Sequence, residues 1–272
     1  MCKVLEQTAL RTLKTVSSYS SSVPGPQLNI LSAIGLWLLT TTGLFVYLIK
    51  VNNQNATNER NEIRYGIVTC LLFFNNLNIL IALCEMALGK HIRLIQDDYQ
   101  KLRLQYASSP GGSVQAAMAY LTMPLPWDRL ADGKLWCRMW STYALYDPSY
   151  QNSESLGFFL DVGNGWTTIP PCLLMNLAMS MPQWHFTTRV RSPLFVGCVC
   201  LASYWQILYG TIVYLVSFVW NQRYQRKSTA ELVGFVGCTN GLWLVFPMMG
   251  ISACVSILHT QDFSVFGYTA TL

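Results

Sequence analysis

Two carboxylic acids, Glu85 and Asp161, lie inside long apolar stretches of this 272-residue chain, where a charged group is costly. Asn78 precedes Glu85 by seven residues, two turns along one helix face, and Asn164 follows Asp161 by three. An apolar environment favours the neutral form of a carboxyl group, which can then donate a proton to an alkene or epoxide. A second carboxyl group can remove a proton elsewhere. The spacing therefore predicts acid–base chemistry on an apolar substrate.

Amides and aromatic rings accompany the two acids. Asn240 precedes Trp243 by three residues, so the amide and the ring are expected to face the same space. Aromatic faces can stabilise a carbocation intermediate. We expect three catalytic residues, in which Asp161 and Glu85 transfer protons and Asn240 orients the substrate. The expected substrate-binding residues are Trp243, Trp166, Asn164, Asn78, Tyr209 and Gln206.

Each of these residues also has a structural interpretation. Asn and Gln in membrane helices often only join helices by hydrogen bonds, and Trp and Tyr often pack or anchor at the headgroups. Glu85 lies near the end of its apolar stretch, within reach of an interface. The letters "GNG" at 163–165 and "PP" at 170–171 predict a kinked helix after Asp161 without requiring catalysis.

Apolar blocks long enough for a bilayer must position these residues. The chain is 52% hydrophobic and only 11% charged, whereas soluble domains carry about 25% charged residues. Five windows reach the roughly 20 residues needed to cross a membrane. These windows are 31–50, 66–89, 156–181, 193–220 and 232–258. The sequence predicts an all-α membrane protein with a bundle of five transmembrane helices.

The distribution of basic residues predicts the orientation. Thirteen Lys and Arg residues fall on one side of the five spans and five on the other, which places the N-terminus in the cytosol. Residues 1–30 are predicted to be a cytosolic amphipathic and Ser-rich segment, and residues 259–272 a C-terminal tail. The net charge of +5 is spread over membrane-flanking loops, so no nucleic-acid partner is expected.

Cysteine and histidine do not suggest a metal site. Seven of the nine cysteines fall inside the spans, where Cys behaves as a small apolar residue. The three histidines lie outside the spans, and Cys198-x-Cys200 has no second ligand pair nearby. We expect neither a metal nor a cofactor.

The loop 90–155 is the largest soluble piece. Residues 92, 95, 99, 102 and 106 are apolar at helical spacing, which predicts an amphipathic helix lying on the membrane. The letters "SSPGG" then break the chain. The segment "KLWCRMWSTYALYDPSYQ" is rich in Trp and Tyr, as is typical of the headgroup interface.

Three stretches resemble the EXPERA family, most closely its emopamil-binding, sterol-isomerase branch. "MWSTYALYDPSY" resembles the family segment W-x-x-Y-A-x-x-D-x-x-Y. "QILYGTIVY" resembles its Q-x-Y-G segment, and "NGLWLVFP" is similar to N-A-L-W-L-V-x-P. The likeness covers residues 66–258, with an enlarged loop at about 92–134.

The resemblance implies a multi-pass protein of the endoplasmic-reticulum membrane with a sterol-like ligand inside a five-helix bundle of EXPERA type. It places Asp161 at the family's acid eleven residues after Tyr150, with Asp in place of Glu. Glu85 matches the family's acid on the second helix, and Asn240 and Trp243 match its pocket Asn and Trp. The family's His, one turn before Glu85, is replaced by Ile81.

Two functional hypotheses follow. The first is a cofactor-independent membrane isomerase or cyclase acting on a sterol-like or terpenoid substrate, in which the loss of the His makes a rearrangement or epoxide-opening enzyme as probable as a sterol isomerase. The second is a non-catalytic sterol- or amine-binding or trafficking protein of the same fold. The lipid bilayer and a hydrophobic small molecule are the expected partners, and a homodimer is left open. A transporter is less well supported, since no inverted repeat is present.

Overall fold

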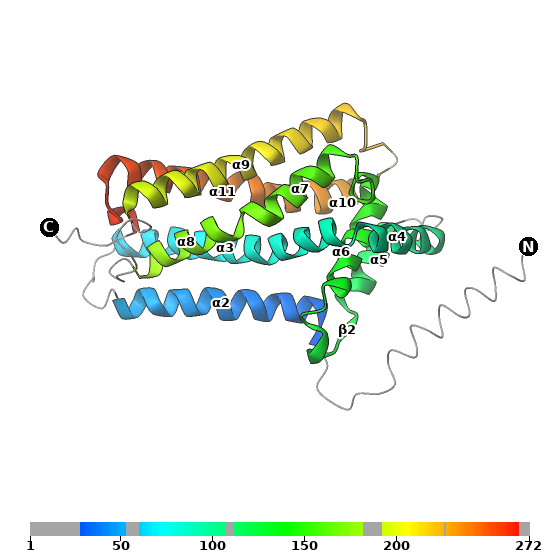
Figure 1. Ribbon diagram of the computed structural model, residues 1–272, viewed down its shortest axis with the longest axis horizontal. Coiled ribbons are helices and arrows are strands. Elements are labelled where there is room, and N and C mark those ends of the chain that lie inside the picture. Colours follow the sequence, from blue (N-terminus) through cyan, green and yellow to red (C-terminus); the bar gives the residue numbers. More distant parts are fainter. Residues whose placement is uncertain (1–27, 53–59, 107–110, 182–191, 226, 267–272) are drawn as a thin grey trace, which may run out of the picture.

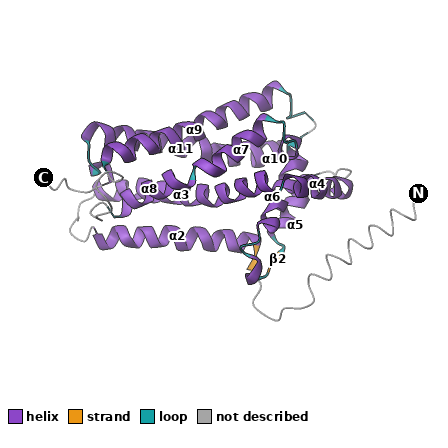
Figure 2. Cartoon of the chain, in the orientation of Figure 1, coloured by secondary structure: helices purple, strands orange, loops and turns teal. Residues whose placement is uncertain are grey.

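The computed structural model describes residues 28–52, 60–106, 111–181, 192–225 and 227–266, which are mostly helical (Figure 2). The predicted amphipathic pattern in the first 27 residues lies outside the described residues. The longer elements are α2 (Ile30–Asn52), α3 (Arg60–Lys90), α4 (Ile92–Tyr106), α5 (Gly112–Leu121), α6 (Gly133–Tyr146), α7 (Leu156–Thr167), α8 (Ile169–Ser180), α9 (Pro193–Trp220) and α11 (Thr239–Thr260). The shorter ones are β1 (Leu28–Asn29), β2 (Pro124–Leu125), η1 (Trp127–Arg129), η2 (Pro148–Gln151), α10 (Thr229–Glu231), the π-helix η3 (Leu232–Cys238) and η4 (Ser264–Phe266).

Long apolar helices lie side by side in the bundle (Figure 1). Within the described ranges, four helical segments are long and apolar enough to cross a bilayer: Ile30–Asn52, Tyr65–Lys90, Pro193–Trp220 and Leu232–Thr260. They coincide with four of the five predicted windows. The prediction of an all-α membrane protein is therefore confirmed at this level.

The remaining window, 156–181, forms two consecutive helices instead of one. α7 and α8 have 12 residues each and meet at Thr168, and together they run beside α3 and α9 (Figure 1). Pro170 and Pro171 have no N–H to donate to the carbonyls four residues earlier, so the helical hydrogen bonding is interrupted there. The sequence predicts a kink in one helix just after Asp161, whereas the structure has two helices that meet at Thr168.

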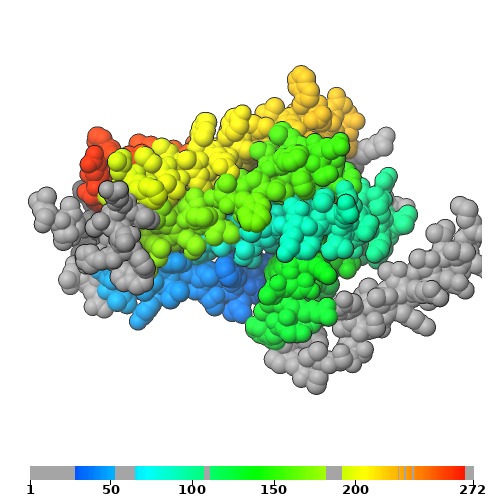
Figure 3. Space-filling view, in the orientation of Figure 1, coloured from blue at the N-terminus to red at the C-terminus, as the bar shows by residue number. Residues whose placement is uncertain are grey.

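The segment between α3 and α7 packs at one end of the bundle (Figure 3). β1 and β2 pair antiparallel, which ties the start of α2 to this segment. The amphipathic helix predicted at 92–106 is present as α4, but the prediction that its apolar face lies on the membrane was wrong. Ile95, Tyr99 and Leu102 are buried in the protein, and Ile95 and Tyr99 share an apolar cluster with residues of α6, so this face does not lie on the membrane surface.

A chain of buried amides joins four helices at the middle of the bundle. The Tyr204 hydroxyl donates to Asn75 Oδ1 at 2.8 Å, and Asn75 Nδ2 donates to Asn176 Oδ1 at 2.9 Å. Asn176 Nδ2 donates to Asn76 Oδ1 at 3.0 Å, and Asn76 Nδ2 donates to Thr42 Oγ1 at 3.2 Å. Every amide group in this chain is paired, which is the arrangement expected of hydrogen bonds that hold membrane helices together.

The C-terminal region is less tail-like than predicted. α11 continues to Thr260, and η4 follows it. Phe266 is buried in the main apolar cluster, and η4 contacts α3. The predicted tail is therefore packed against the bundle up to residue 266.

Candidate functional site

The crossing of α7 over α3 brings the two predicted acids together. A Cβ atom on Gly165 would lie 2.9 Å from Glu85 Cβ and 2.8 Å from the Met86 backbone nitrogen. A Cβ on Gly89 would lie 3.0 Å from Val162 Cγ1. Two glycines thus allow an approach that side chains would prevent. The carboxyl groups of Glu85 and Asp161 are close enough to interact electrostatically.

Glu85 and Asp161 have different surroundings. The Glu85 side chain is buried, and no hydrogen bond joins its carboxyl to another residue that the structure describes. Asp161 is half-buried and is hydrogen-bonded to Tyr150. The pair therefore consists of one acid without a hydrogen-bond partner in the described chain and one acid that is held in place by a phenol.

Aromatic side chains from the loop segment hold Tyr150 in position. Its ring stacks on Trp140 with centroids 5.3 Å apart and meets Tyr143 edge-on at 4.9 Å. Trp140 Nε1 donates to the Cys84 carbonyl at 2.7 Å, next to Glu85. Burial raises the pKa of the Tyr150 phenol well above its usual range, and the charge of Asp161 raises it further. Tyr150 is therefore a neutral hydrogen-bond donor at any physiological pH.

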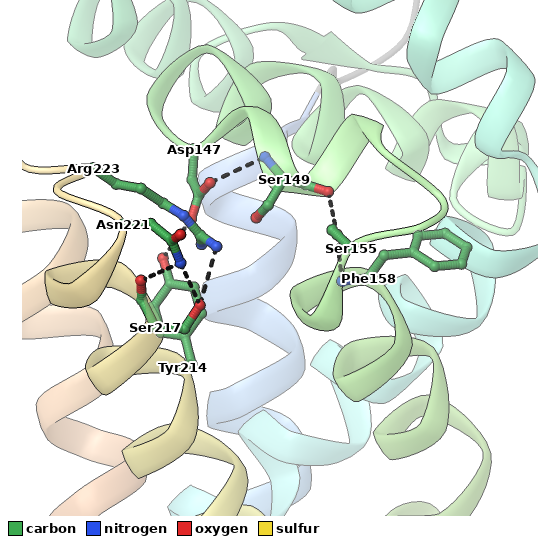
Figure 4. A network of polar contacts seen from close by, with 8 residues as sticks. All are labelled: Asp147, Ser149, Ser155, Phe158, Tyr214, Ser217, Asn221 and Arg223. Atoms are coloured by element: carbon green, nitrogen blue, oxygen red, sulfur yellow. Dashed lines mark hydrogen bonds and ion pairs between the residues drawn. The ribbon is translucent and has the colours of Figure 1, made fainter.

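An ion pair anchors η2, the element that carries Tyr150. Figure 4 shows Arg223, Tyr214 and Ser149 converging on Asp147. Arg223 Nη1 and the Tyr214 hydroxyl each lie 3.0 Å from Asp147 Oδ2, and the Ser149 backbone N–H donates to Oδ1 at 3.0 Å. Tyr214 is also hydrogen-bonded to Tyr143. This network connects the end of α9 to the aromatic residues around Asp161.

The two glycines of "GNG" are expected to differ in their tolerance to substitution. Gly165→Ala should lower stability by about 1–3 kcal/mol, because the new methyl group overlaps α3 at the acid pair. Gly163 has no atom within 4 Å of its would-be Cβ, and so Gly163→Ala should be neutral or stabilising, since Ala favours a helix by about 1 kcal/mol. Melting temperatures in detergent measure both, and equal effects would contradict the close crossing.

Asn78 and Trp243 contact each other in the interior. Trp243 Nε1 donates to Asn78 Oδ1 at 3.0 Å, and Asn78 is buried. The Trp243 ring meets Phe74 edge-on at 6.0 Å. Asn240, by contrast, has Thr239 as its hydrogen-bond partner, at 3.4 Å, and the described contacts do not join it to either acid. The structure thus joins Trp243 to Asn78 and not to Asn240.

Four predicted substrate-binding residues lie toward the outside of the bundle. Trp166 is 66% exposed and Tyr209 is 56% exposed, and Tyr209 stacks on Trp205 with centroids 6.1 Å apart. Gln206 is exposed, and its Nε2 donates at 2.9 Å both to Asn164 Oδ1 and to Thr167 Oγ1.

These positions correct the prediction of an aromatic pocket wall. On α9, the residues Tyr204, Ile207 and Tyr214 are buried, which turns Gln206 and Tyr209 outward. Gln206 and Asn164 therefore join α9 to α7 by hydrogen bonds, which is the structural interpretation of such amides. Trp166 and Tyr209 do not face the acid pair.

Sequence reasoning missed the aromatic residues that surround Asp161. Trp140, Tyr143 and Tyr150 were assigned to a headgroup interface, yet Trp140 and Tyr150 are only 6% exposed, and Tyr143 packs against them. Tyr214 and Asn176 were also missed as hydrogen-bonding residues. The sequence did offer one signal, which is the spacing of the aromatic segment. Trp140, Tyr143 and Tyr150 recur at helical spacing, and Tyr150 lies eleven residues before Asp161.

Comparisons of the chain with protein-family models, with curated proteins and with solved structures returned no match.

Proposed function

We propose that this protein is a membrane-embedded isomerase or cyclase that needs no cofactor and moves protons on an apolar sterol-like or terpenoid substrate. The observation that carries the proposal is the contact region of Glu85 and Asp161 at the α3–α7 crossing, with Tyr150 on Asp161. Two neighbouring carboxyl groups in a low-dielectric bundle repel each other when both are charged. A state in which the pair shares one proton is therefore favoured.

Such a pair has both groups that a proton-shift reaction requires. The protonated carboxyl donates its proton to an alkene carbon or to an epoxide oxygen, which leaves a carbocation on the substrate. The other carboxylate removes a proton from a neighbouring carbon and re-forms the double bond. One proton enters and one leaves, so an isomerisation is balanced without a redox partner. Trp140, Tyr143 and Tyr150 pack together beside Asp161, and a ring face turned to the substrate would support the cationic intermediate.

The EXPERA resemblance is part of this proposal. Trp140, Tyr143, Asp147 and Tyr150 carry the likeness, and their contacts give each of them a physical role beside Asp161. We further propose a five-crossing bundle in the endoplasmic-reticulum membrane with a cytosolic N-terminus. Its supports are the charge bias of the loops and the path of α7 and α8 beside α3.

Deuterium transfer from solvent tests the proposed function. Purified protein in detergent is incubated in D2O with separate panels of unsaturated sterols, acyclic terpenoids and terpenoid epoxides, and the recovered lipids are analysed by mass spectrometry. We expect one class to yield an isomer or a ring-closed product. An alkene substrate should also gain deuterium on carbon, whereas an epoxide takes up its deuteron on oxygen and is recognised by its rearranged product alone. Heat-denatured protein is the control.

A non-catalytic binder of sterols or amines is the second candidate. It is favoured by Ile81, which stands where the resemblance implies a His and removes one group able to transfer protons. Saturable binding without any isomer, ring-closed product or deuterium gain on long incubation would support the binder and overturn the enzyme.

A further inference from the structure

The buried amide of Asn78 has a fixed orientation. Its Oδ1 lies 3.0 Å from Trp243 Nε1. An indole N–H can only donate, so the amide atom that faces it must be the oxygen. The NH2 group of Asn78 therefore points to a different neighbour.

The Asn78 NH2 group has no acceptor in the part of the chain that the structure describes. The side chain is only 3% exposed, so bulk water does not supply one. The side-chain amide N–H groups of Asn75 and Asn76 on α3, and of Asn176 on α8, all have acceptors. Leaving a buried donor unpaired is energetically unfavourable. Because the neighbouring amides are all paired, the unpaired NH2 group of Asn78 indicates an acceptor that comes from outside the chain.

The position of Asn78 relates it to the acid pair. Asn78 and Glu85 are seven residues apart on α3, which puts them on one face of the helix and about 10 Å apart along its axis. Both side chains are buried. An elongated apolar molecule that reaches the acids with one end can reach Asn78 with its other end.

We propose that the Asn78 amide is the site that binds an oxygen atom of the substrate. The ligand is an isoprenoid or polycyclic molecule with a hydroxyl, carbonyl or ether oxygen roughly 10 Å from the carbon that is protonated. An ammonium group offers only donors and cannot pair with the amide NH2. The site therefore selects an oxygenated molecule over an ammonium group at this end. This inference rests on the proposed function and adds the substrate class to it.

Paired probes that differ by one oxygen test the assignment. Binding of a 3β-hydroxysterol is compared with its 3-deoxy analogue, and geranylgeraniol with its deoxy hydrocarbon, in purified protein in nanodiscs. In the unsubstituted protein, one oxygenated probe should bind about tenfold more tightly than its deoxy partner. Asn78→Leu should bring that ratio close to one by weakening only the oxygenated probe. Gln105→Leu, which removes an exposed amide from α4, should leave the ratio unchanged.

Two outcomes overturn the inference: no preference for either oxygenated probe in the unsubstituted protein, or a preference that survives in Asn78→Leu. The first would mean that the amide binds only a water molecule. If Asn78→Leu does not fold, Asn78→Asp keeps the acceptor for Trp243 and removes the NH2 donors. Because the readout is binding, it is independent of turnover. Deuterium gain together with an unchanged ratio would retain the proposed function and remove this inference.

Discussion

Asp161→Asn is expected to lower turnover by at least about 100-fold, the usual contribution of a positioned general acid or base. The substitution preserves shape and the contact with Tyr150 but removes the transferable proton. Glu85→Gln should have a similar effect, since the two carboxyl groups interact at the α3–α7 crossing. Product formation by purified variants measures both effects.

The double variant adds a sharper test of the pair. Residues that act as one unit give non-additive losses, so Asp161→Asn with Glu85→Gln should be hardly worse than the poorer single variant. Glu154, an exposed carboxylate seven residues before Asp161, offers a matched control, and Glu154→Gln should retain full turnover. Turnover that survives in the double variant would show that the acid pair does not carry the reaction.

Arg223→Met is expected to destabilise the protein by about 3 kcal/mol, because it leaves the Asp147 carboxylate buried without its cation. Asp147 is fully buried, whereas the Arg223 side chain is 21% exposed. Asp147→Asn should therefore cost less, since an orphaned guanidinium can reach water and Asn still accepts from the Ser149 backbone N–H. Unfolding midpoints in detergent measure this asymmetry.

Combining the two changes isolates the charge pair from local packing. Asp147→Asn with Arg223→Met should recover much of the loss seen in Arg223→Met alone, since replacing both charges is often nearly neutral. Lys101→Met, at an exposed position of α4, controls for the loss of a positive charge. Strictly additive losses would contradict a coupled buried pair.

The transmembrane helices could be predicted because long apolar blocks are a strong signal that does not depend on packing partners. The apolar face of α4 could also be predicted, because Ile95, Tyr99 and Leu102 recur at helical spacing. The surface that this face contacts could not be predicted, because an apolar face packs in the same way against lipid or against protein. The actual partner, α6, is determined by tertiary contacts with residues some 40 positions away.

The acids of the candidate site could be predicted, but most of their surroundings could not. Glu85 and Asp161 stand out because carboxyl groups are rare in apolar windows. The outward positions of Trp166 and Tyr209 do not stand out, since a membrane helix is apolar all round and its hydrophobicity does not reveal the inner face. The contact of Tyr150 with Asp161 depends on how η2 folds back over α7, which local spacing does not determine.

The ion pair between Asp147 and Arg223 also constrains how the chain is threaded through the bilayer. Asp147 precedes α7 and Arg223 follows α9, yet the two side chains are 3.0 Å apart. Two residues on the same side of a membrane are separated by an even number of crossings, and α9 is long and apolar enough to be one of them. α7 and α8, each about 18 Å long, are too short to cross a 30 Å core singly, and in the proposed five-crossing bundle the two together supply the other crossing. The salt bridge thus supports the proposal that α7 and α8 together form the fifth crossing.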